Sequence, residues 1–316
     1  MSTLALTALV LSASGCHAHE DRIAVIPRTT ATLLWEPMHQ GIMEAARQHG
    51  VHVYWNAPPD EGDTEKQMGL YGSLQRGGYR GFIFSPDETL AARSAVLDTV
   101  GSGIPVVIVD DELGPSPSQG LSYVSNDEAA GALMAARQVL YLLHGRGTIA
   151  VTGIIPKSES SISRDEAFEQ TLGTVAPGVR IVERQFGDTV LTHQEQIAQQ
   201  IMLRPDPVDM IVALSATATR GAYYAKLSAA GHPSVAIIGF DQDLVLPLET
   251  GDVDAIIGQD TRTIGRIAMQ NLEAQMRGER VPGITRVPPI LLTRETMASG
   301  TAKRLLEFPE YSWKDQ

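Results

Sequence analysis

The sequence contains a single cysteine, Cys16, among its 316 residues. No disulfide can form within the chain, and any thiol-based catalysis would have to use that one residue. Aromatic residues are also few, at 5% of the chain, and lysine and arginine (25) are outnumbered by aspartate and glutamate (37). The net charge of −12 repels nucleic-acid phosphates and anionic lipid, so we expect no nucleic-acid partner.

The short motifs of common enzyme and nucleotide-binding classes are absent as well. The sequence has no Gly-x-Ser-x-Gly, His-Glu-x-x-His, Gly-x-x-x-x-Gly-Lys or Gly-x-Gly-x-x-Gly. Its eight histidines are scattered, and the acidic stretches Asp60–Asp63 and Asp110–Glu112 do not match a calcium-binding loop. We therefore predict a protein that is not an enzyme and uses no metal or cofactor.

A short apolar run, Leu4–Leu11, lies near the start of the sequence and is too short to cross a bilayer. It leads into Ser12–Cys16, whose Ala-Ser-Gly-Cys context resembles a bacterial lipobox, the cleavage site before a lipid-carrying cysteine. The first residues, Met1–Thr3, lack the positive charge of such a signal. We expect a signal peptide over residues 1–16, export to the periplasm or another extracytoplasmic compartment, and a lipid anchor on Cys16. The alternative is that Cys16 is an ordinary buried apolar residue.

From Ile23 onward, short apolar runs rich in β-branched residues alternate with amphipathic stretches. This alternation is typical of βαβ units and parallel sheets, and the chain length favours two domains. We therefore predict an α/β fold of two doubly wound parallel-sheet lobes. The nine expected strands are Ile23–Ile26, Val51–Trp55, Gly81–Ser85, Pro105–Asp110, Thr148–Thr152, Val179–Gln185, Met210–Leu214, Val235–Phe240 and Ala255–Gly258.

Two helices are also expected from apolar residues at helical spacing. Between Asp127 and His144 such residues form one stripe, and Ser125 with Glu128 fits a capping box at its start. A second helix follows Thr261. The first stripe comprises Ala129, Leu133, Ala136, Leu140 and Leu143, and the second comprises Ile264, Ile267, Ala268, Leu272 and Met276.

The residues that directly follow the predicted strands are unusually polar. Ligands of open parallel sheets bind beyond the carboxyl ends of the strands, so these residues are candidates for a binding site. For Asp87, Asp111 and Asp243 taken singly, a solvated turn or a helix cap is the simpler interpretation. The candidate segments are Arg28–Thr30, Ser85–Asp87, Asp110–Glu112, Ser215, Asp241–Asp243 and Gln259–Asp260.

Several segments, in this order and spacing, resemble the type I periplasmic binding proteins, the ribose- and galactose-binding family that shares its core with LacI-type repressors. The resemblance covers nearly all of Ile23–Glu295. The matching segments are Ile104–Asp110, Ser125–Asp127 before Gly131, Arg164 four residues before Phe168, Ile238–Asp241, Ile257–Asp260 and Leu292–Glu295.

The resemblance implies two lobes joined by a three-segment hinge, with crossings near Ser125–Asp127, near Gln259 and after Ile284. It implies a first lobe of residues 22–125 and 260–285, a second lobe of residues 126–259 and 286–300, and a tail of residues 301–316, to which we assign no role. Carried over by position, the residues that line the family's sugar cleft correspond to Asp110, Arg164, Asp241 and Gln259. Carboxylates and guanidinium groups suit the hydroxyls of a polyol.

The sequence departs from the family at the same site. Ser215 and Ala216 stand where the family often has an Asn-Asp pair. Trp35 offers an aromatic face for a pyranose, or packs in the first helix. Arg28 meets an anionic group of the ligand, or pairs with a nearby aspartate. These departures point to a less usual ligand than a common hexose or pentose.

The resemblance implies an exported, monomeric solute-binding protein that captures a small polar ligand, a sugar or sugar derivative, for the permease of an ABC-type transporter. Two alternatives stay open. A ligand sensor would present its closed form to a membrane signalling protein. A transcription-regulator core would need a DNA-binding module, and the residues before Ile23 are too few and too apolar to supply a helix-turn-helix.

Overall fold

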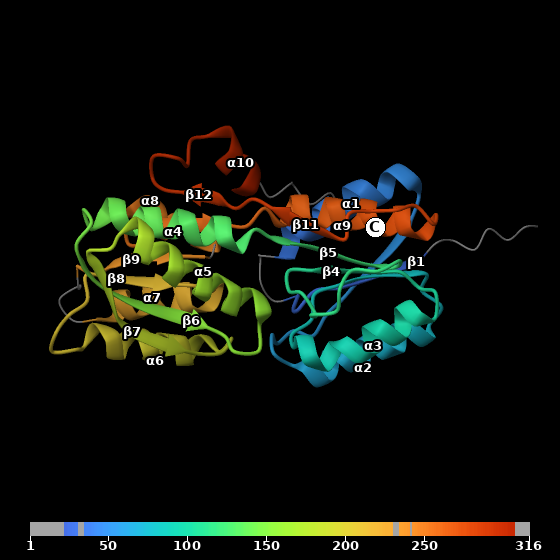
Figure 1. Ribbon diagram of the computed structural model, residues 1–316, viewed down its shortest axis with the longest axis horizontal. Helices are drawn as coiled ribbons and strands as arrows, with labels where there is room; N and C mark the ends of the chain where they lie inside the picture. The colour runs from blue at the N-terminus through green and yellow to red at the C-terminus, as the bar shows by residue number, and fades with distance from the viewer. Residues whose placement is uncertain (1–21, 31–34, 230–233, 241, 307–316) are drawn as a thin grey trace, which may run out of the picture.

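The computed structural model describes residues 22–30, 35–229, 234–240 and 242–306, which form two α/β lobes side by side (Figure 1). The described part of the chain confirms the predicted fold class, because each lobe is built on its own six-stranded sheet. All nine expected strands are present within a residue or two of their predicted ends. Cys16 and Asp241 lie outside the described residues.

The first lobe contains a fully parallel sheet in the order β11-β5-β4-β3-β1-β2. Helices α1 and α9 cover one face of this sheet, and α2 and α3 cover the other. The strands are β1 (Arg22–Ile26), β2 (His52–Trp55), β3 (Gly81–Phe84), β4 (Val106–Val109), β5 (Leu121–Asn126) and β11 (Ile284–Val287). The helices are α1 (Glu36–His49), α2 (Thr64–Arg76), α3 (Thr89–Gly101) and α9 (Thr261–Met276).

The second lobe contains a sheet in the order β12-β10-β9-β8-β6-β7, in which only the edge strand β12 pairs antiparallel. Helices α4 and α5 pack on one face, and α6, α7, α8 and α10 contribute to the core on the other. The strands are β6 (Gly147–Ile154), β7 (Val179–Phe186), β8 (Met210–Ala213), β9 (Ala236–Gly239), β10 (Ala255–Gly258) and β12 (Ile290–Leu292). The helices are α4 (Glu128–Leu142), α5 (Glu159–Val175), α6 (Leu191–Met202), α7 (Ala216–Ser228), α8 (Val245–Thr250) and α10 (Gly300–Leu306), with a 3₁₀ turn η2 (Gln242–Leu244) before α8.

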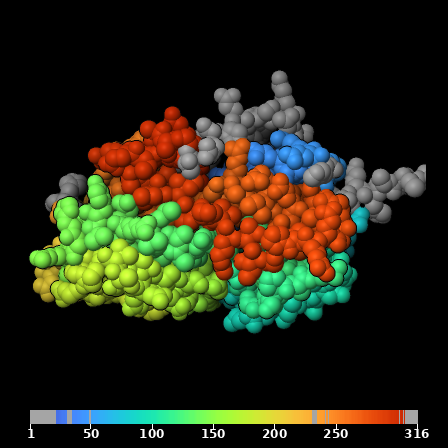
Figure 2. All heavy atoms as spheres, turned by 45° about the horizontal axis from the view of Figure 1, so that its top comes forward, coloured from blue at the N-terminus to red at the C-terminus, as the bar shows by residue number. Residues whose placement is uncertain are grey.

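The described chain passes between the lobes after β5, after β10 and between β11 and β12. The first and third passages run together, because the backbone N–H of Asp127 donates to the carbonyl of Val287 at 2.9 Å. In Figure 2, the segments coloured orange to red, from α9 onward, extend across both lobes on one face of the molecule. The two sheets are thus joined at one side, and the ends of their strands face each other between the lobes.

Tight helix packing fixes α9 to the first lobe. A Cβ added at Gly265 of α9 would lie only 2.3 Å from the carbonyl oxygen of Met38 in α1, so the two backbones can approach only because this residue is glycine. The predicted apolar stripe of α9 is correct: Ile264, Ala268 and Leu272 are fully buried. The sequence therefore encodes this contact through one glycine and a regular apolar spacing.

Helix α4 differs from the prediction in two respects. Its N-cap is Asp127, whose side chain accepts from the N–H of Ala130, so the predicted capping box on Ser125 is wrong. Its buried face also differs from the expected stripe, since Leu140 is 38% exposed while small residues lie inside. The buried residues of this helix are Glu128, Gly131, Ala132, Ala135, Ala136 and Val139. Helix α5 packs closely on α4, and short side chains make that approach possible.

Candidate functional site

A polar pocket lies between the lobes, where the carboxyl ends of strands from both sheets meet. It contains about 670 Å³ of space, a figure that includes open solvent at its mouth. The structure brings six of the predicted ligand residues together here: Arg28, Trp35, Asp110, Arg164, Ser215 and Gln259. They come from both lobes, as a site that closes around a ligand requires.

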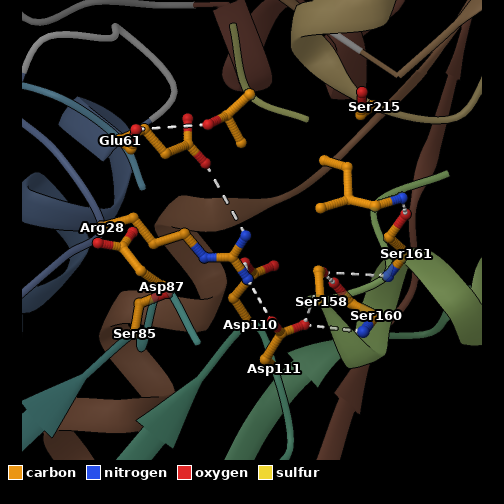
Figure 3. Close-up of polar contacts among 12 residues, drawn as sticks. Arg28, Glu61, Ser85, Asp87, Asp110, Asp111, Ser158, Ser160, Ser161 and Ser215 are labelled. Carbon is orange, nitrogen blue, oxygen red and sulfur yellow. Dashed lines mark hydrogen bonds and ion pairs between the residues drawn. The ribbon is translucent and has the colours of Figure 1, made fainter. Parts of the chain in front are cut away.

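Arg28 follows β1 in the first lobe and is buried, with 8% of the residue exposed. Its guanidinium lies 2.7 Å from a carboxylate oxygen of Asp110 and 2.6 Å from one of Asp111, and 3.8 Å from Glu61 (Figure 3). Burial disfavours its charge, but these carboxylates outweigh burial and hold the pKa of Arg28 above its usual value. Of the two predicted roles for Arg28, pairing with aspartates is the one seen in this structure.

Asp110 and Asp111 follow β4, the strand with the Ile-Pro-Val motif. Asp110 adopts a left-handed backbone with φ of 72°, a conformation that is uncommon for a residue other than glycine. Burial raises the pKa of Asp110 to about 6, because desolvation outweighs the opposing effect of Arg28. Asp111 is not a solvated turn residue: its side chain is fully buried between Arg28 and helix α5.

Arg164, in the first turns of α5, is held by groups of the second lobe. Its guanidinium donates to both carboxylate oxygens of Glu128, at 2.6 and 3.0 Å, and to the carbonyl of Leu214. It also lies 4.7 Å above the ring of Phe240. This set of contacts fixes the guanidinium plane at the edge of the pocket, with Glu128 supplying the compensating charge.

Ser215 and Gln259 reach the pocket from the ends of β8 and β10. The hydroxyl of Ser215 caps α7 by accepting from the N–H of Ala218 at 3.2 Å. The backbone of Gln259 exchanges two hydrogen bonds with the side chain of Gln242, at 3.1 and 3.2 Å. Both residues are therefore held in place by neighbours within the second lobe.

Trp35 packs in the first-lobe core, which is one of its two predicted roles. It is 4% exposed and packs in the core beneath α1, together with Met38 and Val109. It also lines the pocket, so part of the indole borders the space available to a ligand. The low exposure means that this side chain cannot reorient without disturbing the first-lobe core.

Several pocket residues were missed at the level of the sequence because no motif marks them. Glu61 belongs to the acidic stretch that matched no calcium-binding loop, yet burial raises its pKa and the residue lines the pocket. Only the fold, which brings the segment before α2 close to the strand ends, places Glu61 in the pocket. The other missed lining residues are Ile155, Ser158, Ser160, Ser161, Thr189, Thr217, Arg220 and Phe240.

The described lining suits hydrogen bonding to a polyhydroxylated molecule. Carboxylate oxygens of Asp110 and Glu61 can accept from hydroxyls, while guanidinium groups and serine hydroxyls can donate. Among the described residues, no group of three or more histidine, cysteine, aspartate or glutamate side chains could hold a metal ion. Within the same residues, no helix is both long enough and apolar enough to cross a membrane.

Comparison with known families finds a match to the family model described as "Periplasmic binding protein domain" over residues 23–280. The D-allose-binding periplasmic protein of Escherichia coli (strain K12) is 24% identical over 290 residues, covering 88% of this chain and 91% of that protein. Both matches extend across the two lobes and the pocket between them.

Solved structures resemble the fold. An ABC transporter solute-binding protein from Agrobacterium vitis, bound with α-D-tagatopyranose, aligns with a TM-score of 0.82 at 21% identity, covering 90% of this chain and 98% of that one. The structure of the XylFII–LytSN complex aligns with a TM-score of 0.77 at 22% identity, covering 87% of this chain and 98% of that one. At these identities the structures establish the fold alone, so the function has to be inferred from the residues of the pocket.

Proposed function

The chain belongs to the periplasmic binding protein domain family, and we propose that it is a solute-binding protein that captures a sugar or sugar derivative between its lobes. The observation that carries this proposal is the two-sided pocket: charged and hydroxyl groups of both lobes converge on one space at the strand ends. A closed pocket of this kind surrounds a polyol with donors and acceptors, which is how small polar ligands gain affinity.

The relatives support the same ligand class. The E. coli relative is a D-allose-binding protein, a Paraburkholderia graminis relative is a D-apiose import binding protein, and the A. vitis structure holds a tagatose. These proteins bind sugars and are described by transport or binding, not by catalysis. We infer that this chain has no enzymatic activity and that its ligand reaches an ABC-type permease.

Location and anchoring are part of the proposal. The E. coli relative is periplasmic, which supports an extracytoplasmic site for this chain. We propose that Cys16 carries the lipid anchor expected from its lipobox-like context. Mass spectrometry of membrane-extracted protein would find a lipid-modified Cys16 at the mature N-terminus. An unmodified Cys16, or a mature start elsewhere, would overturn the anchor alone.

The direct test is ligand capture. Purified protein is screened by thermal shift against aldoses, ketoses, deoxy-sugars, amino-sugars and uronic acids, with amino acids as a non-sugar control. A sugar that raises the melting temperature is then titrated by calorimetry, because a ligand bound only by the folded state stabilises it. Turnover is followed in the same samples by chromatography. Stabilisation by amino acids and by no sugar, or turnover of the ligand, would contradict the proposal.

Residue roles are tested with the identified sugar. We propose that Asp110, Arg164, Asp241 and Gln259 contact it, with Arg28, Trp35 and Ser215 shaping the rest of the pocket. Asp241→Ala and Arg164→Ala should each weaken binding strongly. The assignment fails if both variants fold and bind as tightly as the wild type.

A sensor role is the second candidate. It is favoured by the structural neighbour that is a complex of two proteins, XylFII and LytSN. A pull-down from solubilised membranes with ligand-saturated protein separates the two uses: an ABC permease supports transport, whereas a membrane signalling protein supports sensing.

A further inference from the structure

One carboxylate joins the two lobes across the pocket. Asp111 follows β4 in the first lobe, and its side chain is fully buried. One of its oxygens lies 2.6 Å from the guanidinium of Arg28, in the same lobe. The other accepts from the N–H of Ser160 at 2.8 Å and from the hydroxyl of Ser158 at 3.3 Å, both at the start of α5 in the second lobe (Figure 3).

We propose that Asp111 is a latch that stabilises the closed arrangement of the lobes and couples it to the position of Arg28. The proposal rests on the function above only in that closure surrounds the ligand. Asp111 is a positioning residue, because Arg28, Ser158 and Ser160 line the pocket while Asp111 lies behind them. It acts on the ligand through the arrangement of its neighbours.

The chemistry of the contact explains why it favours closure. The first N–H groups of a helix have no partner within the helix and carry partial positive charge. In the closed arrangement the fully buried carboxyl group of Asp111 accepts from one of these N–H groups of α5, that of Ser160. When the lobes separate, Arg28 stays with Asp111 because both belong to the first lobe, but the bonds to α5 are lost and water replaces them.

Two other contacts between the lobes, an exposed ion pair and a neutral hydrogen bond, are weaker in kind. Lys157 forms an ion pair with Glu88, but its side chain is 72% exposed, and an exposed pair contributes little in water. The hydroxyl of Thr189 donates to the carbonyl of Glu61 at 3.3 Å, a neutral bond. The charge of Glu61 also interacts with Arg220 of the second lobe, and the Glu159 carboxylate accepts from the N–H of Glu112 in the first lobe. Asp111 differs from these groups because its side chain is fully buried and is bonded to both lobes, so we assign it a large share of the bias toward closure.

A latch of this kind has a measurable consequence for binding. If the closed form binds the ligand and the open form does not, the apparent dissociation constant rises as the closed fraction falls. Loss of a charge-assisted hydrogen bond corresponds to a change of about tenfold in such an equilibrium. Replacing Asp111 should thus lower the ligand affinity and the closed fraction of the ligand-free protein by the same factor.

The experiment measures the two conformations directly. Donor and acceptor dyes are placed on Leu97→Cys in α3 and Leu203→Cys after α6, which are 42% and 81% exposed on different lobes, in a Cys16→Ser background. Single-molecule energy transfer then gives the closed fraction without ligand. In wild type we expect a measurable closed fraction, and in Asp111→Asn a fraction lower by about tenfold. The sugar found in the screen should bind Asp111→Asn more weakly by a similar factor.

A matched pair tests the helix side of the contact. Ser160→Pro removes the N–H that reaches Asp111, at a first-turn position where proline is tolerated, whereas Ser160→Ala keeps it. Ser160→Pro should open the ligand-free protein as Asp111→Asn does, and Ser160→Ala and Lys157→Ala should leave the ligand-free populations as in wild type. Ser160→Pro also keeps the test decisive if Asp111→Asn fails to fold.

The failure of the latch is distinct from the failure of the proposed function. If no sugar binds, the function is wrong, but the ligand-free populations still decide the latch. The latch is overturned if folded Asp111→Asn and Ser160→Pro show wild-type populations, or if ligand-free wild type is entirely open.

Discussion

The pocket holds two buried arginines whose surroundings differ. Arg164 receives its partners, Glu128, the carbonyl of Leu214 and the ring of Phe240, from the second lobe alone. Arg28 is bound to Asp111, which also reaches across to α5. The hydrogen bonds of Arg164 therefore do not depend on closure, although its charge also interacts with Asp110 and Asp111 of the first lobe. The hydrogen-bond partners around Arg28, in contrast, change when the lobes separate. One side of the pocket is preorganised, and the other is completed by closing.

The two sides also differ in charge balance. Arg164 has one buried carboxylate, Glu128, as its partner. Around Arg28 stand Glu61, Asp87, Asp110 and Asp111, and burial raises the pKa of Asp110 to about 6 and that of Asp87 to about 7 despite the opposing effect of Arg28. The first-lobe side therefore takes up protons near neutral pH. The predictions below test this contrast, beginning with the largest effect.

Removing the preorganised arginine should cost the most. Arg164→Met leaves Glu128 buried without its partner, and we expect the free energy of unfolding to fall by about 3–5 kcal/mol and ligand affinity to fall by at least about a hundredfold. Urea denaturation and calorimetry measure the two effects. Glu128→Gln is the comparison variant: its amide oxygen can still accept one of the two guanidinium hydrogen bonds, so we expect a smaller loss of stability. An Arg164→Met variant as stable as wild type would show that the pair is not a structural element.

Removing Arg28 should give a loss that depends on pH. In Arg28→Met the Asp110 carboxylate loses the cation that opposes the effects of burial and of the Asp111 charge, so the pKa of Asp110 rises further and the folded protein binds protons. We expect the variant to be less stable than wild type by about 2–4 kcal/mol at pH 8 and to recover most of that loss near pH 5. Denaturation at both pH values measures this, and an equal loss at both would contradict the difference in charge balance.

Asp87 should produce a smaller effect of the opposite sign. Its folded-state pKa of about 7 lies above the value of about 4 expected when unfolded, so between these values the folded protein binds more protons. This contribution to stability is present below pH 4 and is lost as the pH rises toward 7. Asp87→Asn should therefore raise the free energy of unfolding at pH 8 by about 1–3 kcal/mol and flatten its decline between pH 4 and 7. Thermal unfolding measured across that pH range tests this prediction, and Asp98→Asn on the surface of α3 is the control.

Breaking the exposed pair between the lobes should have the smallest effect. Lys157→Ala removes the partner of Glu88. We expect the free energy of unfolding to change by less than about 0.5 kcal/mol and the ligand affinity to change less than twofold. A larger loss of affinity would show that exposed contacts at the rim of the pocket, and not only the buried ones, favour closure.

Much of the fold could be predicted because buried parallel strands are continuous apolar runs. Strands β4 and β8 are fully buried and were found from composition alone. Three other strands were missed: β5 contains serine and asparagine, β11 is a mostly exposed edge strand, and β12 has only three residues. Their strand state depends on pairing with neighbours, which local composition does not carry.

The pocket could be predicted only in part, for a related reason. Asp110, Ser215 and Gln259 stand at strand ends, so topology predicts that they converge. The sequence around Asp111 indicated a turn or a helix cap, because the residues that Asp111 contacts across the cleft cannot be identified from its neighbours in the sequence. Glu128 likewise fitted a capping box, whereas its carboxylate binds Arg164 on the adjacent helix.

The sequence alone determined the α/β class, the two lobes and the strand ends where polar residues gather, since apolar periodicity and chain order carry that information. The tertiary structure decided which charges meet. It gave Arg164 one partner within its lobe, and it placed Asp111 between Arg28 and the start of α5. Such pairings depend on how two separately folded sheets face each other, and no local pattern of residues encodes that distance.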